Sequence, residues 1–126
     1  MTESPGDATA RANAPPAALD VVVVGGGVAG LSAAVYTARQ GLDTLVVDPG
    51  SSILRRNARL ENFPGFPLGV DARRLLDLLA EQAETAGADR LDARVTRVSL
   101  ADGEADAVDV EAGDADGHAR FAVTTD

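Results

Sequence analysis

The hydrophobic positions between residues 20 and 50 predict a strand, a helix and a second strand. Four consecutive valines at 21–24 form an apolar run with the length of a buried strand. The apolar helix that follows is expected to end at Gly41, because glycine readily takes the left-handed conformation that stops a helix. A second apolar run at 44–47 ends at the acid Asp48. This order predicts a βαβ unit whose two strands pair in parallel.

The rest of the chain predicts one more helix and three more strands. Residues 71–86 place leucines on one helical face, with Asp71 as a good N-cap and a glycine after the last turn. Residues 91–100 alternate as a strand does, and shorter strands are expected near 107–111 and 120–124, separated by acidic, turn-prone linkers. We expect these three strands to form an antiparallel β-meander appended to the parallel sheet.

Together these elements predict one α/β domain of Rossmann-like type over residues 20–126, with a parallel sheet flanked by helices. We expect the sheet to be incomplete, lacking its final strand. Residues 1–19 are rich in Ala, Pro, Ser and Thr, which predicts a flexible, dispensable tail. The irregular segment 49–70 contains several prolines and glycines, but its leucines and phenylalanines favour an ordered, functional loop.

Composition and charge exclude several classes of function. The chain has 20 acidic residues against 11 basic ones, all Arg, for a net charge of −9, and such a field repels nucleic acid and anionic lipid. No cysteine is present, which excludes a disulfide framework and a Cys-x-x-Cys redox pair in this chain. No apolar run suits a signal peptide or a membrane span, so a cytoplasmic location is expected. The excess of Asp and Ala fits a high-salt cytoplasm or a GC-rich genome equally well.

No metal site is expected either. The acids between residues 102 and 116 lack the alternating ligand spacing of a calcium loop, so they predict a solvated acidic hairpin. His118, the one histidine, lies in that hairpin and is expected at the surface rather than in acid–base catalysis. The sequence therefore identifies no catalytic residue.

The turn between the first strand and the first helix reads Gly25-x-Gly27-x-x-Gly30. Gly25 allows the tight turn, Gly27 lets a pyrophosphate approach bare backbone, and Gly30 lets the helix press against the strand. The helix N-terminus adds unpaired N–H donors and the positive end of a dipole. Asp48 can accept hydrogen bonds from a ribose, whereas a 2′-phosphate about 4 Å away would cost on the order of 4 kcal/mol, which disfavours NADP here. The alternative is a glycine-rich turn in another α/β domain.

A family resemblance follows from the glycine motif, the strand-end acid, the segment Glu61-Asn62-Phe63-Pro64-Gly65-Phe66-Pro67 and the helix LLDLLAEQAETAGA. Together they resemble the FAD-binding domain of thioredoxin reductase-like flavoproteins, the low-molecular-weight branch of the pyridine nucleotide-disulfide oxidoreductases. The resemblance covers roughly residues 21–126 and is strongest over 21–88. It implies FAD as the cofactor. It also implies a role for each of several residues. Asp48 would bind the adenosine ribose, Asn62 would contact the flavin or ribityl chain, and the backbone of Val95 would contact the adenine. The pyrophosphate would be held by Gly25, Gly26, Gly27, Val28, Ala29 and Gly30.

Three departures limit what the resemblance implies. The family's Gly-Gly-Gln-Leu segment is replaced by residues 51–57, in which Ser51 and Ser52 remain as donors. Arg55, Arg56 and Arg59 are expected to be solvated more often than to bind anions. Without cysteine the chain alone cannot exchange disulfides. The family's NAD(P)H domain and second flavin-binding segment are not found within these 126 residues, so NAD(P)H is expected as donor only if a second domain or partner supplies its site.

The leading hypothesis is therefore the FAD-binding part of an NAD(P)H-dependent flavin oxidoreductase that resembles thioredoxin reductase but lacks its disulfide. One alternative is an NAD-dependent dehydrogenase domain, which Asp48 permits. Another is a non-catalytic module that binds FAD or a partner. An open sheet edge would favour self-association or a partner subunit that completes the sheet.

Overall fold

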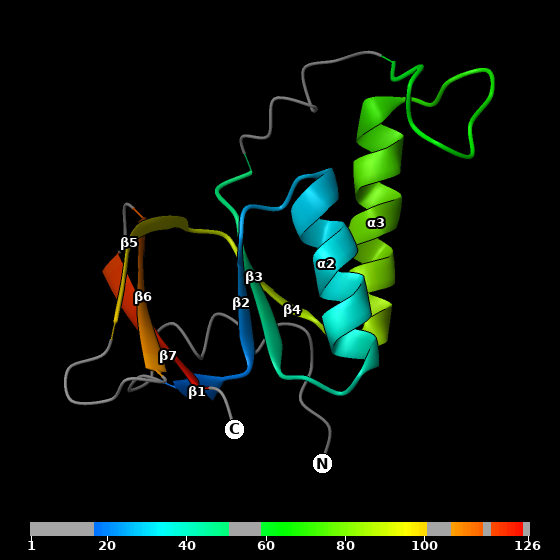
Figure 1. Cartoon of the computed structure of the whole chain (residues 1–126). Coiled ribbons are helices and arrows are strands. Elements are labelled where there is room, and N and C mark those ends of the chain that lie inside the picture. Colours follow the sequence, from blue (N-terminus) through cyan, green and yellow to red (C-terminus); the bar gives the residue numbers. More distant parts are fainter. Residues whose placement is uncertain (1–16, 51–58, 101–106, 115–116, 125–126) are drawn as a thin grey trace.

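The computed structural model of the chain describes residues 17–50, 59–100, 107–114 and 117–124. These residues form two sheets and two helices (Figure 1). The elements in chain order are β1 (Ala17–Leu19), β2 (Val21–Val24), α2 (Val28–Arg39), β3 (Thr44–Val47), α3 (Ala72–Ala86), β4 (Asp89–Leu91), β5 (Arg94–Leu100), β6 (Ala107–Asp114) and β7 (Gly117–Thr124).

The first sheet is parallel, with the strand order β2-β3-β4. Both helices cover one of its faces, and they run side by side with their N-termini at the same end of the molecule (Figure 1). The second sheet has the order β1-β7-β6-β5 and lies against the opposite face (Figure 1). Its strands β5, β6 and β7 form an antiparallel meander, as the sequence predicts. The Rossmann-like α/β prediction with an appended meander is therefore confirmed.

Strand β3 is the centre of the core because it is buried on both faces. Leu45 and Val47 point to the second sheet, while Val46 points to the helices. The cluster between the two sheets consists of Leu19, Leu45, Val47, Leu91, Ala93 and Ala112. The cluster under the helices consists of Leu31, Ala34, Val35, Ala38, Val46, Leu76, Ala80, Ala83 and Ala88. Five alanines in the second cluster explain how the helices pack closely on the sheet and on each other.

The predicted helix 71–86 is found with the expected ends. The Asp71 side chain accepts a hydrogen bond from the Arg74 backbone N–H at 3.0 Å, and Gly87 ends the helix in the left-handed conformation. Among the described residues, neither helix has the length and apolar character needed to cross a bilayer.

Two predictions about strands are wrong. Residues 91–100 do not form one strand, because β4 ends at Leu91 in the parallel sheet and β5 begins at Arg94 in the second sheet. Ala17–Leu19, placed in the flexible tail by the sequence analysis, form β1, which pairs in parallel with β7 and buries Leu19. The remaining part of that tail, residues 1–16, lies outside the described residues.

The corner between β1 and β2 is a single residue, Asp20, which joins the two sheets. Its carboxylate accepts a hydrogen bond from the Asp43 N–H at 2.7 Å, and its own N–H donates to the Asp43 carbonyl oxygen at 3.0 Å. These bonds tie the corner to the start of β3. The amino ends of β2 and β3 are thereby held in register.

Truncating Leu76, which is fully buried under the helices, should destabilise the fold by about 2–5 kcal/mol in Leu76→Ala, because the cavity cannot collapse completely. The matched control is Leu78→Ala on the same helix, where the side chain is 37% exposed and the expected loss is about 0.5 kcal/mol. Urea unfolding followed by circular dichroism measures both. Equal losses would contradict the packing described for α3.

Candidate functional site

The turn after β2 carries the chain directly from the sheet into α2. Gly25 has φ +101°, a conformation that L side chains rarely adopt, and its N–H donates to the Val47 carbonyl oxygen at 2.9 Å. This bond extends the pairing of β2 with β3 by one residue and holds the turn at the carboxyl ends of both strands. Ligands of open α/β sheets bind at that edge.

Gly30 marks the closest approach of α2 to the turn. A Cβ placed at Gly30 would lie 2.0 Å from the Gly25 carbonyl oxygen and 3.0 Å from Cγ1 of Val23. The first distance excludes any side chain because it involves backbone, and the second is tight enough that Val23 would have to shift. Glycine at this position therefore allows the first turn of the helix to rest on β2.

The N-terminus of α2 offers backbone donors without a capping side chain. Gly27 is the N-cap residue, and no side-chain hydrogen bond caps the helix. The first intrahelical bond runs from the Leu31 N–H to the Gly27 carbonyl oxygen at 2.9 Å. The N–H groups of the residues between them have no partner within the helix. With no acidic residue in the first turn, the helix N-terminus suits an anion.

Asp48 lies beside this turn and is 6% exposed. Its backbone N–H donates to the Leu91 carbonyl oxygen at 3.0 Å, which fixes the end of β3 against β4. Its carboxylate packs against Gly26, where an added Cβ would lie 2.9 Å from Oδ2. Oδ2 is buried and has no hydrogen-bond partner among the described residues. Because a buried carboxylate oxygen without a donor is costly, this atom fits a ligand hydroxyl group.

The contact between Gly26 and Asp48 is the feature that the sequence analysis missed. The sequence placed Gly26 in the phosphate cradle, whereas the structure shows that its missing side chain leaves room for the carboxylate. The signal in the sequence is the third consecutive glycine, since the motif itself requires only the outer two of Gly25-Gly26-Gly27.

The structure brings Gly25 to Gly30 and Asp48 together, but not Asn62 or Val95. Asn62 is exposed in the loop that precedes α3, and that loop lies at the N-terminal end of α3, on the side away from β2 (Figure 1). Val95 is in β5, where it pairs with Ala112 and packs against the core between the sheets. Their roles stay predictions.

The loop that holds Asn62 is closed at its base by an antiparallel bridge between Leu60 and Val70, with hydrogen bonds of 2.7 and 2.8 Å. Inside it the rings of Phe63 and Phe66 lie 6.0 Å apart. The Arg59 guanidinium donates to the Leu68 carbonyl oxygen, so this arginine supports the loop. The described part of segment 49–70 is thus ordered, as its apolar residues suggest.

Several other predicted positions cannot be placed. Ser51, Ser52, Arg55 and Arg56 lie outside the described residues, as does the side chain of His118. Among the residues that are described, no three His, Cys, Asp or Glu side chains gather as a metal site would require.

Comparisons with known proteins agree with this geometry. Residues 20–59 match the FAD dependent oxidoreductase family. The chain is 37% identical over 83 residues to thioredoxin reductase of Aquifex aeolicus and 38% identical over 84 residues to that of Streptomyces coelicolor. Each alignment covers 64% of this chain and 26% of the relative, so the match spans about a quarter of the relatives' length.

Solved structures show the same likeness in three dimensions. A thioredoxin reductase from Gloeobacter violaceus superposes with a TM-score of 0.67 at 30% identity, covering 82% of this chain and 34% of that one. Thioredoxin reductase from Lactococcus lactis gives 0.72 at 28% identity, covering 85% and 33%. Sequence and fold together show that this chain is similar to one part of the thioredoxin reductases and has their Rossmann-like fold, and the family match over residues 20–59 supports FAD as the cofactor.

Proposed function

We propose that this chain is the FAD-binding part of an NAD(P)H-dependent flavin oxidoreductase. The observation that carries the proposal is the buried, unpartnered Oδ2 of Asp48 beside the Gly25–Gly30 turn. A dinucleotide is the ligand that brings a diphosphate and a sugar hydroxyl to these two places at once.

The residues of the site would bind and orient the cofactor. The uncapped N–H groups at the start of α2 would hold the pyrophosphate, and the positive end of the helix would offset its charge. Asp48 would accept hydrogen bonds from the adenosine ribose, because its carboxylate already faces Gly26 at the mouth of the turn. FAD, once bound, would supply the acceptance and transfer of electrons, while the protein supplies position and electrostatics.

The source and destination of the electrons belong to the same proposal. The chain has no cysteine, which supports the view that it does not exchange disulfides itself. The site described here accounts for one dinucleotide, so NAD(P)H would require a second domain or a partner. The electron acceptor is not specified by any residue of the site. A cytoplasmic location stays a prediction.

Two alternatives make different predictions about ligands. An NAD-dependent dehydrogenase domain would use the same turn and the same Asp48, and selective binding of NAD over FAD in calorimetry would favour it. A non-catalytic module would bind FAD without turnover of NADH. The FAD proposal is preferred because the family match over residues 20–59 is to FAD-dependent proteins.

Purified protein should bind FAD and turn yellow, and Gly27→Val should abolish this binding. Gly27 has φ −82°, which any residue can adopt, so the substitution adds bulk where the pyrophosphate approaches without straining the backbone. FAD fluorescence quenching measures affinity, and circular dichroism checks the fold. Ala33→Val, at an exposed position of the same helix, is the control and should bind FAD normally. Colourless protein that ignores added FAD would contradict the proposal.

Asp48 should select against a phosphate on the ribose. ADP-ribose should bind about 1000-fold more tightly than its 2′-phosphorylated form, because the phosphate would meet the carboxylate at a cost of about 4 kcal/mol. Asp48→Asn should reduce this ratio to about tenfold or less. Glu81→Gln, which removes the same charge from an exposed position of α3, should leave the ratio unchanged. If the ratio of the two affinities were unchanged in Asp48→Asn, Asp48 would not be the residue that contacts the ribose.

We also propose that the free edge of β2 takes part in association. Among the described residues β2 pairs only with β3, and its four valines carry no charge that would discourage a further strand. Either a second copy or a partner subunit would supply that strand.

The free edge predicts concentration-dependent association in light scattering of purified protein. Val24→Lys, at a position 58% exposed in β2, should weaken this association because it places a charge at the edge. Leu78→Lys on α3 is the control and should associate like the parent chain. A strictly monomeric protein, or equal effects of both substitutions, would contradict a role of the β2 edge.

A further inference from the structure

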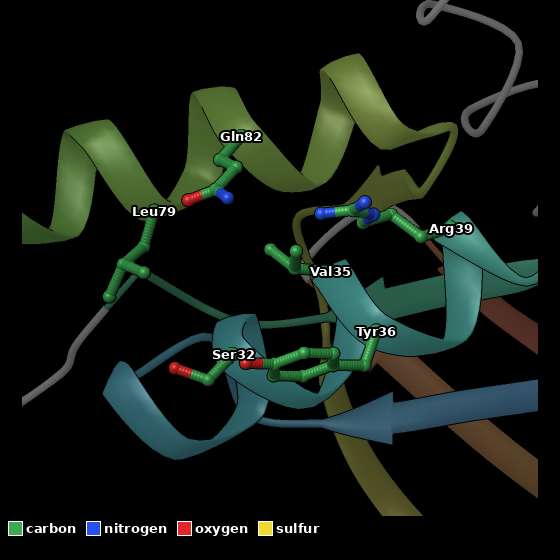
Figure 2. Close-up of a pocket in the computed structure, with 6 residues that line it drawn as sticks. All are labelled: Ser32, Val35, Tyr36, Arg39, Leu79 and Gln82. Carbon is green, nitrogen blue, oxygen red and sulfur yellow. The ribbon is translucent and has the colours of Figure 1, made fainter.

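A groove lies between α2 and α3 and does not belong to the dinucleotide site. Figure 2 shows the side chains around it: four come from α2 and two from α3. They are Ser32, Val35, Tyr36, Arg39, Leu79 and Gln82. The groove holds about 130 Å³. Its α2 residues lie beyond the first turn of the helix, whereas the dinucleotide site uses the turn that precedes the helix.

The base of the groove is apolar. Val35 is 5% exposed and belongs to the core under the helices, and Leu79 is half-buried against the same core. The ring of Tyr36 borders the groove but remains 69% exposed. A large aromatic side chain beside an apolar hollow is a surface that a second apolar group can cover.

Every polar side chain around the groove can donate a hydrogen bond, and Arg39 is the one charged residue among them. The Arg39 guanidinium extends from the last turn of α2 toward Gln82 on α3 (Figure 2). Arg39 forms no salt bridge with another described residue, and no acidic side chain lines the groove. The Gln82 amide and the hydroxyls of Ser32 and Tyr36 add further donors. A cation would be repelled by Arg39, whereas a carboxylate would find a charged partner.

The side-chain charges of the two helices balance and do not oppose an anion. α2 and α3 together carry three arginines and three acidic residues, so the pair of helices has no net side-chain charge although the whole chain has a charge of −9. An anion is therefore less repelled here than the net charge of the whole chain would suggest. The volume of the groove limits the size of the ligand, since a cavity of roughly 150 Å³ accommodates one benzene ring.

We propose that the groove between α2 and α3 is a binding site for a small free carboxylate that carries a single ring or a short branched alkyl group. The apolar part of this ligand covers Val35 and Leu79 and stacks on the ring of Tyr36, and its carboxylate binds the Arg39 guanidinium. The limited volume favours such a small molecule over a peptide segment. The proposal does not depend on FAD binding.

The test is a nuclear magnetic resonance titration of the full chain, labelled with nitrogen-15, with and without saturating FAD. Benzoate should shift the amide signals of residues 32–39 and 79–82 to saturation in both samples. Benzamide, which has the same ring without the charge, should bind at least about tenfold more weakly, because a charge-assisted hydrogen bond is lost. Acetate, which has the charge without the ring, should also bind more weakly.

Substitutions separate the charge of Arg39 from general electrostatics. Arg39→Gln should weaken benzoate binding at least about tenfold. Arg74→Gln, which removes an exposed charge of α3 outside the groove, should change it by less than about twofold, since a distant exposed charge is screened. Equal weakening by both variants, equal binding of benzoate and benzamide, or the absence of saturable shifts would overturn the proposal. So would shifts centred on residues 25–30, or shifts of the groove signals with protein concentration alone, which would indicate a second copy as the occupant.

Discussion

The contact between Gly30 and the Gly25 carbonyl oxygen is the constraint from which the site follows. No side chain fits between them, so the first turn of α2 lies directly on the end of β2. This approach fixes where the helix begins, and therefore where its uncapped N–H groups are presented. It also brings Gly26 over the end of β3, where the Asp48 carboxylate fills the space that a side chain would have taken. The uncapped backbone N–H groups and the buried carboxylate, which we propose for the diphosphate and the ribose, are thus consequences of one packing arrangement.

Local sequence signals were enough to predict the βαβ unit. The valines of β2, the glycine turn and the apolar run of β3 follow each other within about thirty residues, so each element limits the next. The α3 helix was equally predictable from the sequence, because Asp71 and Gly87 mark its ends and leucines mark its buried face. The pairing partners of the βαβ unit are close in sequence, and the ends and buried face of α3 are marked by residues of the helix itself.

Pairings between distant segments were not predictable in the same way. The alternating pattern continues through Asp92 and Ala93, so nothing in it reveals that the chain leaves one sheet for the other there. β1 has three residues and no strand-like composition, and it exists because β7 offers it a partner. In the site, too, some features follow from the local sequence and others depend on distant segments. Asp48 was found from its place at a strand end, but its burial and its unpartnered oxygen depend on β4 and on the turn. The flavin-binding role of Asn62 was predicted from a motif alone, and that motif does not predict where the loop lies relative to the Gly25–Gly30 turn.

The register of β1 has a consequence for the order of folding. Leu19 lies opposite Val123, more than a hundred positions away, and β1 has no other neighbour in its sheet among the residues that the structure describes. The βαβ unit needs only nearby segments and can form while the chain is still leaving the ribosome, whereas β1 must wait for the meander. Until β7 emerges, Leu19 stays in water and the inner surface of β3 is uncovered. Of the described strands, the first to be synthesised is therefore the last to be buried, and a chaperone would find its target on the sheet face that later receives the meander.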